Sequence, residues 1–286
     1  MVHKTLLVIV GPTASGKSAY AVKLAKKLGG EVISADSRQV YKGLDIGTGK
    51  ITKKEMRRVP HHLLDIASPK KVFTASEYRE QGRAVLGDII SRGKVPILCG
   101  GTGFYIDVLV GRIEMPDVPP NPVLRAKLEK KSAHELHAIL KKMDPRRAQN
   151  IDAQNPVRLV RAIEIAKALG RVPRPKPKLL PYHLEWIGLR PDEKTLQRKI
   201  HTRLLARMKQ GMVLEAKKLH KSGVSYKRMH ALGLEYRYLA LLLRKKITKK
   251  EFVVQLESAI WQYSKSQMKY WKRNKEIRWV RPVARV

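Results

Sequence analysis

The sequence predicts an α/β fold, in which a parallel sheet around a phosphate-binding P-loop is flanked by helices and interrupted by a helical insertion domain. Short apolar runs alternate with helical segments, as in open parallel sheets. A glycine-rich loop, GPTASGKS, follows the first apolar run at residues 11–18. Strand-like segments stop near residue 111 and return near residue 184. We therefore expect ligands at the carboxyl ends of the strands, where such sheets bind them.

The first part of the core alternates strands with helices. Its fully apolar first strand, LLVIV, is typical of a buried parallel sheet. Gly29 and Gly30 supply the stop signal of the helix that follows the loop. The expected strands are residues 6–10, 31–35, 61–65 and 95–99, and the expected helices are 17–28 and 75–92.

The middle of the chain changes character. A proline-rich join, PDVPPNP, spans residues 116–122, and a basic, extended one, RVPRPKPK, spans 171–178. Residues 123–169 between them show helical spacing. We therefore assign 1–112 and 180–286 to the catalytic core and 113–179 to the helical insertion.

The core resumes with a strand at 184–189 and a helix from Asp192 to about residue 211. Thr248 and Glu251 form a capping box that opens a long helix. We expect one stripe of that helix to be buried, and three lysines to share another face. The stripe is Phe252, Leu256, Ala259 and Tyr263, and the lysines are Lys265, Lys269 and Lys272. Its later aromatic residues are either core or base-stacking groups: Trp261, Tyr270 and Trp271.

Composition points to a polyanionic partner. The 286 residues carry 60 Lys and Arg against 24 Asp and Glu, a formal charge of +36, which favours nucleic acid. Alternatively, the positive charge reflects a generally basic proteome or serves solubility. A single cysteine, Cys99, excludes an internal disulfide. The apolar runs are too short for a signal peptide or a membrane span, so we expect a cytoplasmic protein.

The loop is a P-loop, as in nucleotide- and ATP-binding proteins, and its alternative is a chance glycine-rich turn. Backbone N–H groups and a helix N-terminus surround phosphate oxygens, Lys17 adds a point charge, and the Ser18 hydroxyl suits Mg²⁺. His61 and His62 lack further metal-ligand partners, so we interpret them as structural. The diphosphate-binding residues are Gly11, Pro12, Thr13, Ala14, Ser15, Gly16, Lys17 and Ser18.

Motifs along almost the whole chain resemble the bacterial tRNA dimethylallyltransferases, also called tRNA isopentenyltransferases. The most specific block is ISADSRQVYKGLDIGTGK at 33–50, beside GPTASGKS at 11–18. Looser matches are HHLLD at 61–65, GGTGFY at 100–105, DPRRA at 144–148, NPVRLVRAIEI at 155–165 and HALGLEY at 230–236. Ser266 stands where the family usually carries an arginine.

The resemblance implies a reaction and its partners. A dimethylallyl group passes from dimethylallyl diphosphate to the exocyclic amine of the adenosine 3′ of the anticodon, and pyrophosphate leaves. The partners are therefore the donor, the anticodon stem-loop of tRNA and Mg²⁺, and we expect a monomer. The implied catalytic residues are Lys17, Asp36, Thr102 and Arg203, with Arg203 also on the diphosphate.

Asp36 matches the family's proposed general base, and its alternative role is in the shell of Mg²⁺. Two segments match RNA contacts, because a stacked adenine must be flipped out to react. Without the resemblance, we would interpret these two segments as ordinary polar surface. The implied tRNA-binding residues are Asp36, Ser37, Arg38, Gln39, Thr102, Val157, Arg158, Leu159, Val160 and Arg161.

Three other functions compete with tRNA prenylation. A P-loop kinase of a nucleoside or small metabolite explains the loop but not the 33–50 block or the charge. A prenyltransferase of free adenine nucleotides explains the motifs but does not need so basic a surface. An RNA-binding module with a vestigial loop is disfavoured by the intact Lys17, Ser18, Asp36 and Thr102.

Overall fold

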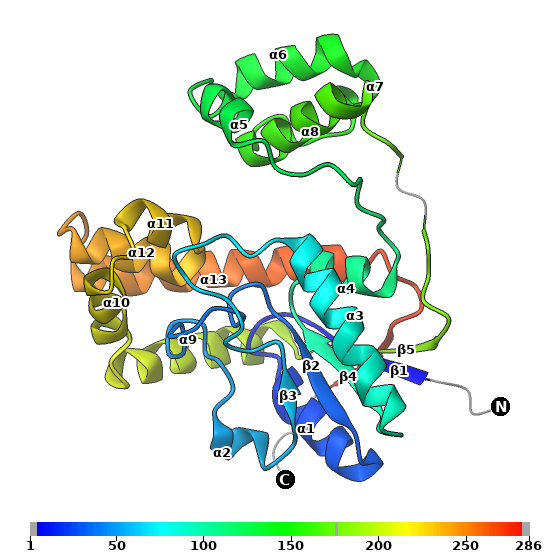
Figure 1. Ribbon diagram of the computed structural model, residues 1–286. Helices are drawn as coiled ribbons and strands as arrows, with labels where there is room; N and C mark the ends of the chain where they lie inside the picture. Colours follow the sequence, from blue (N-terminus) through cyan, green and yellow to red (C-terminus); the bar gives the residue numbers. More distant parts are fainter. Residues whose placement is uncertain (1–4, 175–176, 282–286) are drawn as a thin grey trace. The chain divides into compact units, whose positions relative to one another are not determined.

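A six-stranded parallel sheet forms the centre of the core (Figure 1). The computed structural model describes residues 5–174 and 177–281. The strand order is β3-β2-β4-β1-β5-β6, which confirms the predicted P-loop sheet. The strands are β1 (Thr5–Val10), β2 (Glu31–Ala35), β3 (His61–His62), β4 (Pro96–Gly100), β5 (His183–Leu189) and β6 (Arg278–Val280).

The register shows how the chain re-enters the sheet after the insertion. Ile9 of β1 lies opposite Cys99 of β4 on one side and Ile187 of β5 on the other. Strand β5 therefore continues the sheet beside the strand that precedes the P-loop. The expected strand over 61–65 is wrong in length, because only His61 and His62 pair with β2. Leu63 and Asp65 adopt positive φ angles of 61° and 56°, which end the strand.

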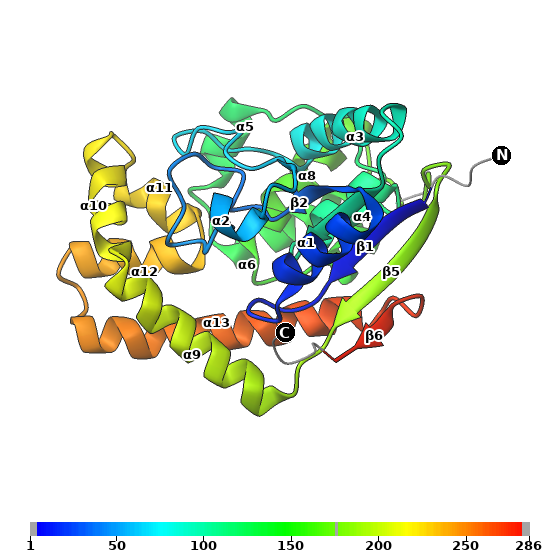
Figure 2. The same cartoon turned by 90° about the horizontal axis from the view of Figure 1, so that it is seen from below.

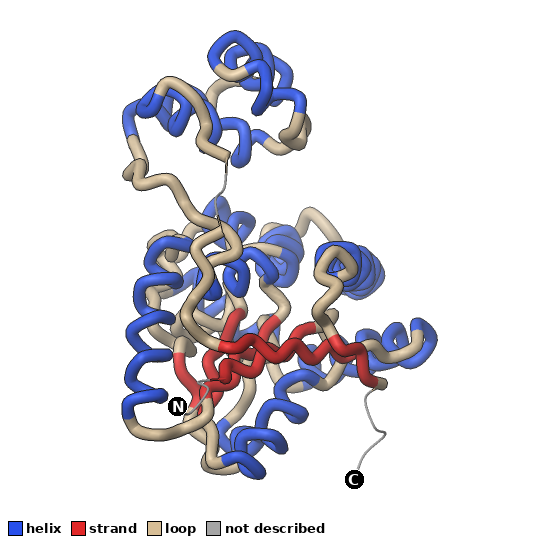
Figure 3. Tube along the Cα trace, turned by 90° about the vertical axis from the view of Figure 1, so that its right-hand side faces the viewer, coloured by secondary structure: helices blue, strands red, loops and turns tan. Residues whose placement is uncertain are grey.

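Helices cover both faces of the sheet (Figure 3). Helix α1 (Lys17–Leu28) buries Ala21, Val22 and Ala25 against strand residues such as Ile9 and Ile97. Helices α3 (Ala75–Ser91) and α4 (Gly103–Val110) pack on each other, and Tyr78 stacks on Tyr105 with ring centroids 4.0 Å apart. Because helices cover both faces of the sheet, the central strands are fully buried, and their sequences are continuous apolar runs.

The C-terminal part of the core is helical, and α9 and α13 run side by side (Figure 2). The buried stripe of α13 differs from the expected one, since it includes Phe252, Leu256, Ile260, Ser264, Gln267 and Trp271 but not Ala259 or Tyr263. The helices are α2 (Lys53–Met56), α9 (Glu193–Lys209), α10 (Met212–Lys221), α11 (Tyr226–Ala231), α12 (Leu234–Leu243) and α13 (Lys249–Trp271). No helix of the described residues is long and apolar enough to cross a bilayer.

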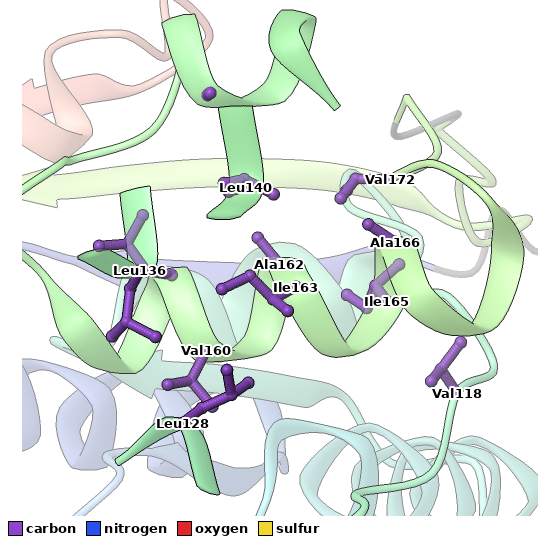
Figure 4. Close-up of a cluster of buried hydrophobic side chains, with 12 residues drawn as sticks. Val118, Leu128, Leu136, Leu140, Val160, Ala162, Ile163, Ile165, Ala166 and Val172 are labelled. Carbon is purple, nitrogen blue, oxygen red and sulfur yellow. The ribbon is translucent and has the colours of Figure 1, made fainter. Parts of the chain in front are cut away.

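The chain divides into two compact units, one of Met1–Val110 with Leu179–Val286 and the other of Gly111–Lys178. The second unit has its own apolar core, which includes Leu136, Leu140 and Ile163 (Figure 4). Its helices are α5 (Pro122–Leu128), α6 (Ala133–Met143), α7 (Pro145–Gln149) and α8 (Pro156–Leu169). Each begins at a capping side chain, from Asn121, Ser132, Asp144 and Asn155.

One buried carboxylate holds the segments of the second unit together. Glu164 on α8 accepts hydrogen bonds from the Asn121 backbone N–H at 2.6 Å and from Arg125 at 2.8 and 2.9 Å. Arg161 adds a short ion pair with Glu164. Burial alone would raise the pKa of Glu164, but these hydrogen bonds outweigh it and lower the pKa to about 2.

Candidate active site

The P-loop has the backbone conformation that an anion-binding loop needs. Gly11 has φ 145°, and a Cβ there would lie 2.5 Å from the Leu189 carbonyl oxygen, so only glycine fits. Gly16, with φ 93°, begins helix α1. The loop therefore lies between strand and helix, where backbone N–H groups and the helix dipole attract phosphate.

Lys17 and Ser15 show that the loop is built for an anion. The Lys17 ammonium donates to the Pro12 carbonyl oxygen at 2.6 Å, and burial lowers its pKa to about 8. The Ser15 hydroxyl is fully buried and has no hydrogen-bond partner. Ser18 is exposed at the start of α1. A buried, unpaired hydroxyl beside a desolvated lysine is stabilised when phosphate oxygens arrive.

Gln267 on α13 fixes the loop from outside, a role that sequence reasoning missed. Its side-chain oxygen accepts the Thr13 backbone N–H at 2.8 Å, and its amide donates to the Gly101 carbonyl oxygen at 3.0 Å. The side chain is only 6% exposed. Gln267 therefore joins the P-loop to the turn after β4. Its place in a helical stripe was the available signal.

Asp36 and Thr102 follow the adjacent strands β2 and β4 and lie together, as the pattern predicted. One Asp36 carboxylate oxygen accepts the backbone N–H groups of Arg38 at 2.8 Å and Gln39 at 3.3 Å. The Thr102 hydroxyl accepts the Ser37 backbone N–H at 3.0 Å. This network fixes both side chains at the carboxyl edge of the sheet.

Lys17, Asp36 and Arg203 are electrostatic neighbours. Burial is the main cause of the lowered pKa of Lys17; the charges of Cys99 and Asp36 oppose this shift, and the charge of Arg203 adds to it. Burial and the Arg207 charge lower the pKa of Arg203 to about 10, although solvent still reaches its side chain. No hydrogen bond or ion pair within residues 5–174 and 177–281 engages the Arg203 guanidinium, so it is available to an anion.

Two further side chains reach this space without a sequence signal. Tyr263 lies near Thr102, and partial burial of its phenol followed by the charge of Asp36 raises its pKa to about 12. Glu235 lies near Arg207, and burial raises its pKa. Arg38 packs against Gly233, where a Cβ would lie 2.8 Å from its Nε atom. The helices after residue 191 therefore supply one wall of the site.

The residues of the insertion predicted to bind tRNA separate into two groups. Leu159 and Val160 are buried in its core, so their side chains support the helix instead of facing a ligand. Arg161 is occupied by Glu164 and by the Val118 carbonyl oxygen, to which it donates at 2.8 Å. Val157 is 77% exposed and Arg158 is exposed, so these two can meet RNA.

Metal-ligating side chains do not cluster in the part of the chain that the structure describes. His61 bonds the Val59 carbonyl oxygen at 2.9 Å, and His62 pairs with Glu31 at 2.7 Å, in keeping with structural roles. The Ser18 hydroxyl and the Asp36 carboxylate are the hard oxygen donors near the loop, and they fit Mg²⁺ held mainly by diphosphate and water.

The C-terminal aromatic residues and the cysteine have mostly structural surroundings. Trp271 is 1% exposed and packs near Trp186, and Tyr270 hydrogen-bonds Asp107. Trp261 is partly exposed, with the Lys265 ammonium 5.6 Å from its ring centre. Burial raises the pKa of Cys99 to about 12, so it is an inert thiol.

The fold and the site define a P-loop protein of the α/β class, with a carboxylate and a hydroxyl at the carboxyl edge of the sheet. The family model for IPP transferase matches residues 39–274. A tRNA dimethylallyltransferase of Treponema denticola is 42% identical over 96% of this chain and 95% of its own. One from Geotalea uraniireducens is 41% identical over 94% and 88%.

Solved structures agree with these relatives. The tRNA isopentenylpyrophosphate transferase of Bacillus halodurans matches with a TM-score of 0.73 and 34% identity, over 97% of this chain and 90% of its own. The chain therefore belongs to the IPP transferase family. The comparisons give no support to the kinase alternative.

Proposed function

We propose that the protein is a tRNA dimethylallyltransferase that prenylates the exocyclic amine of the adenosine 3′ of the anticodon. The observation that carries this proposal is the P-loop after β1 at the same edge of the sheet as Asp36 and Thr102, which follow the neighbouring strands β2 and β4 and are joined through Ser37. The Arg203 guanidinium, which lies against Gly49, adds positive charge from the part of the core after the insertion. Relatives named for this activity support the assignment.

The donor's diphosphate occupies the P-loop in this proposal. The backbone of residues 11–18, Lys17 and Arg203 surround it, and their positive charge stabilises the leaving group as negative charge grows. The carbon–oxygen bond of the donor breaks while a carbon–nitrogen bond to adenosine forms. Pyrophosphate leaves, and no phosphoryl group is transferred. The Ser18 hydroxyl would hold Mg²⁺, which would neutralise part of the diphosphate charge when bound.

Asp36 accepts the proton that the amine loses. Its carboxylate is held by the N–H groups of Arg38 and Gln39, so it stays aimed at the edge where β2 and β4 end. The adenine amine becomes acidic as it attacks carbon, so a carboxylate within hydrogen-bond reach suffices as base. The Thr102 hydroxyl beside it is placed to orient the amine or the reacting carbon.

The acceptor base must leave its stack to reach this site. Ser37, Arg38 and Gln39 are the polar groups that read its exposed edge, next to Asp36 and Thr102. We assign the helical insertion a role in holding the anticodon stem-loop, with the exposed Arg158 as one phosphate contact. We further propose that the enzyme acts as a monomer in the cytoplasm.

Mass spectrometry of nucleosides tests the proposal directly. Unmodified tRNA is incubated with the protein, Mg²⁺ and dimethylallyl diphosphate, then digested. We expect adenosine that carries one added prenyl unit. Prenylation of free AMP without tRNA modification would move the function to a nucleotide prenyltransferase. Consumption of ATP with a phosphorylated acceptor would return the P-loop to the kinases.

A further inference from the structure

Glu215 accepts hydrogen bonds from three consecutive backbone N–H groups of one loop. The carboxylate lies on α10 and receives the N–H groups of Asp45 at 2.9 Å, Ile46 at 2.7 Å and Gly47 at 2.9 Å. The phenol of Tyr236, which is 1% exposed, donates to it at 2.6 Å. Charge-assisted bonds to backbone N–H groups are among the stronger hydrogen bonds, so the loop is tied to α10.

Glycines allow the loop to fit closely against its surroundings. A Cβ at Gly47 would lie 2.7 Å from the Tyr236 ring. A Cβ at Gly49 would lie 2.5 Å from an Arg207 nitrogen and 2.9 Å from an Arg203 nitrogen. The loop is thus in direct contact with both guanidinium groups, and its position limits where they can lie.

Other contacts complete the clamp around residues 45–50. Arg207, which is 9% exposed, donates to the Gly47 carbonyl oxygen at 3.1 Å and pairs with Glu235 at 3.4 Å. Lys50 is buried, and its ammonium joins the Tyr41 carbonyl oxygen at 2.9 Å to Asp45 at 2.7 Å. The Arg207 guanidinium is therefore engaged by the loop and Glu235. The Arg203 guanidinium on the same helix has no hydrogen-bond or ion-pair partner among the described residues, so it is available to bind the diphosphate.

We propose that Glu215 is a positioning residue for the proposed transferase reaction: by fixing the loop at 45–47 it holds in place Gly49, against which the Arg203 guanidinium lies. Glu215 itself touches neither substrate. The inference rests on the proposed function only in assigning diphosphate to the P-loop. It adds a physical reason why Arg203 and not Arg207 is free, and it assigns a function to α10, which sequence reasoning left without one.

A double-mutant cycle read by pyrophosphate binding tests the coupling. Glu215→Gln is measured by calorimetry in the wild-type and Arg203→Ala backgrounds, with Mg²⁺ present. We expect the pyrophosphate Kd to rise about tenfold in the first background and less than twofold in the second, since residues joined through one network couple by this order. Glu257→Gln is the matched control. A Glu257 carboxylate oxygen lies 2.8 Å from a ring nitrogen of His201, which is on α9 like Arg203, but Glu257 does not bond the 45–47 loop.

Equal losses in both backgrounds would overturn the proposal, because a merely structural role does not depend on Arg203. Tyr236→Phe provides a milder variant if Glu215→Gln does not fold, since it removes one donor to Glu215 and retains the ring. We expect the same background dependence with a smaller change. Wild-type enzyme that binds pyrophosphate but fails to prenylate tRNA would contradict the proposed function and leave this coupling intact.

Discussion

At the scale of single residues, the site contains charged groups whose surroundings suit them to specific tasks. Lys17 is desolvated beside the P-loop backbone, and Asp36 is fixed by two N–H groups. Arg203 is cationic and has no partner among the described residues. In the proposed reaction, these residues supply positive charge for a leaving diphosphate and a base for an incoming amine, which are the two needs of prenyl transfer.

The depressed pKa of Lys17 predicts how donor binding depends on pH. Without ligand, Lys17 loses its proton near pH 8, well below its ordinary 10.5. Diphosphate prefers the protonated form, so above pH 8 binding must take up a proton. We expect the affinity for dimethylallyl diphosphate to fall up to about tenfold per pH unit above pH 8. Calorimetry between pH 7 and 9.5 measures this.

The donor's own phosphate protons, with a last pKa of about 6, have left before this window opens. Lys17→Ala is the control, and it should bind more weakly but with a flat response over the same range. A wild-type affinity that stays constant to pH 9.5 would mean that Lys17 does not face the diphosphate.

Asp36→Asn separates the general base from the loop structure. The amide oxygen of asparagine can still accept the Arg38 N–H, now 2.8 Å away, so the backbone is retained while the charge is lost. We expect single-turnover transfer to slow by about 10²- to 10⁴-fold, while tRNA still binds. Asp88→Asn, an exposed carboxylate paired with Arg92, is the control. Unchanged turnover would remove the assignment.

At the scale of elements, α13 connects the C-terminal helices to the P-loop through one side chain. Gln267→Leu removes both the Thr13 and the Gly101 hydrogen bonds of a buried group. We expect the free energy of unfolding to fall by about 1–3 kcal/mol, since buried partners are left unsatisfied, and donor affinity to weaken with it. Gln262→Leu, exposed on the same helix, should stay within about 0.5 kcal/mol in denaturant titrations. Equal effects would contradict the role of Gln267.

Buried carboxylates predict where the fold fails in acid. The pKa of Glu164 falls from 4.5 to about 2 in the folded state, because its hydrogen bonds outweigh burial. The hydrogen bonds from Arg92 lower the pKa of Glu31 to about 2 as well, although burial acts to raise it. A lowered folded-state pKa stabilises the protein above the unfolded value, and this stabilisation disappears as the pH falls from about 4.5 to 2.

Denaturant titrations from pH 7 to 3 test this window. The wild type should lose stability as the pH falls below 4.5, and Glu164→Gln should be less stable at pH 7 but less sensitive to acid. Glu129→Gln, exposed in the same unit, is the control. An acid response in Glu164→Gln as steep as the wild type's would mean that other carboxylates carry the effect.

Periodicity predicted most elements, because buried parallel strands and capped helices leave local signals. Residues 6–10, 31–35 and 184–189 are strands as expected, and Thr248 does cap α13. The third strand was overestimated, because the left-handed turn at Leu63 is not visible in an apolar run. The buried stripe of α13 was displaced, because polar Ser264 and Gln267 face inward.

The site was predictable where it lies next to a strand end or in a motif, as for Lys17, Asp36 and Thr102. Gln267, Tyr263 and Glu215 arrive from helices more than a hundred residues after the P-loop. Their tasks depend on how α10 and α13 pack, and a helical stripe in one sequence does not show which element it packs against. Conversely, Leu159 and Val160 lie in a basic segment but face the core of the insertion.

At the scale of the whole molecule, a formal charge of +36 is distributed over a chain that folds into two units. Several arginines are already used internally, such as Arg125 and Arg161 on Glu164. Most other cations are exposed, so their charge is available to a polyanion. In the proposed function, this surface contributes sequence-independent affinity for tRNA, while discrimination falls to the few groups around Asp36.

Salt dependence tests whether this charge meets RNA. If 6–10 phosphates are contacted, tRNA affinity should fall by about 10³- to 10⁵-fold between 50 and 200 mM salt, because bound counterions are released. Arg158→Gln should reduce the logarithmic salt slope by about one, whereas Lys27→Gln, on the last turn of α1, should leave it unchanged. Filter binding at several salt concentrations measures each slope. A flat wild-type response would mean that the positive surface faces solvent and not tRNA, and recognition would then have to come from the polar residues beside Asp36 alone.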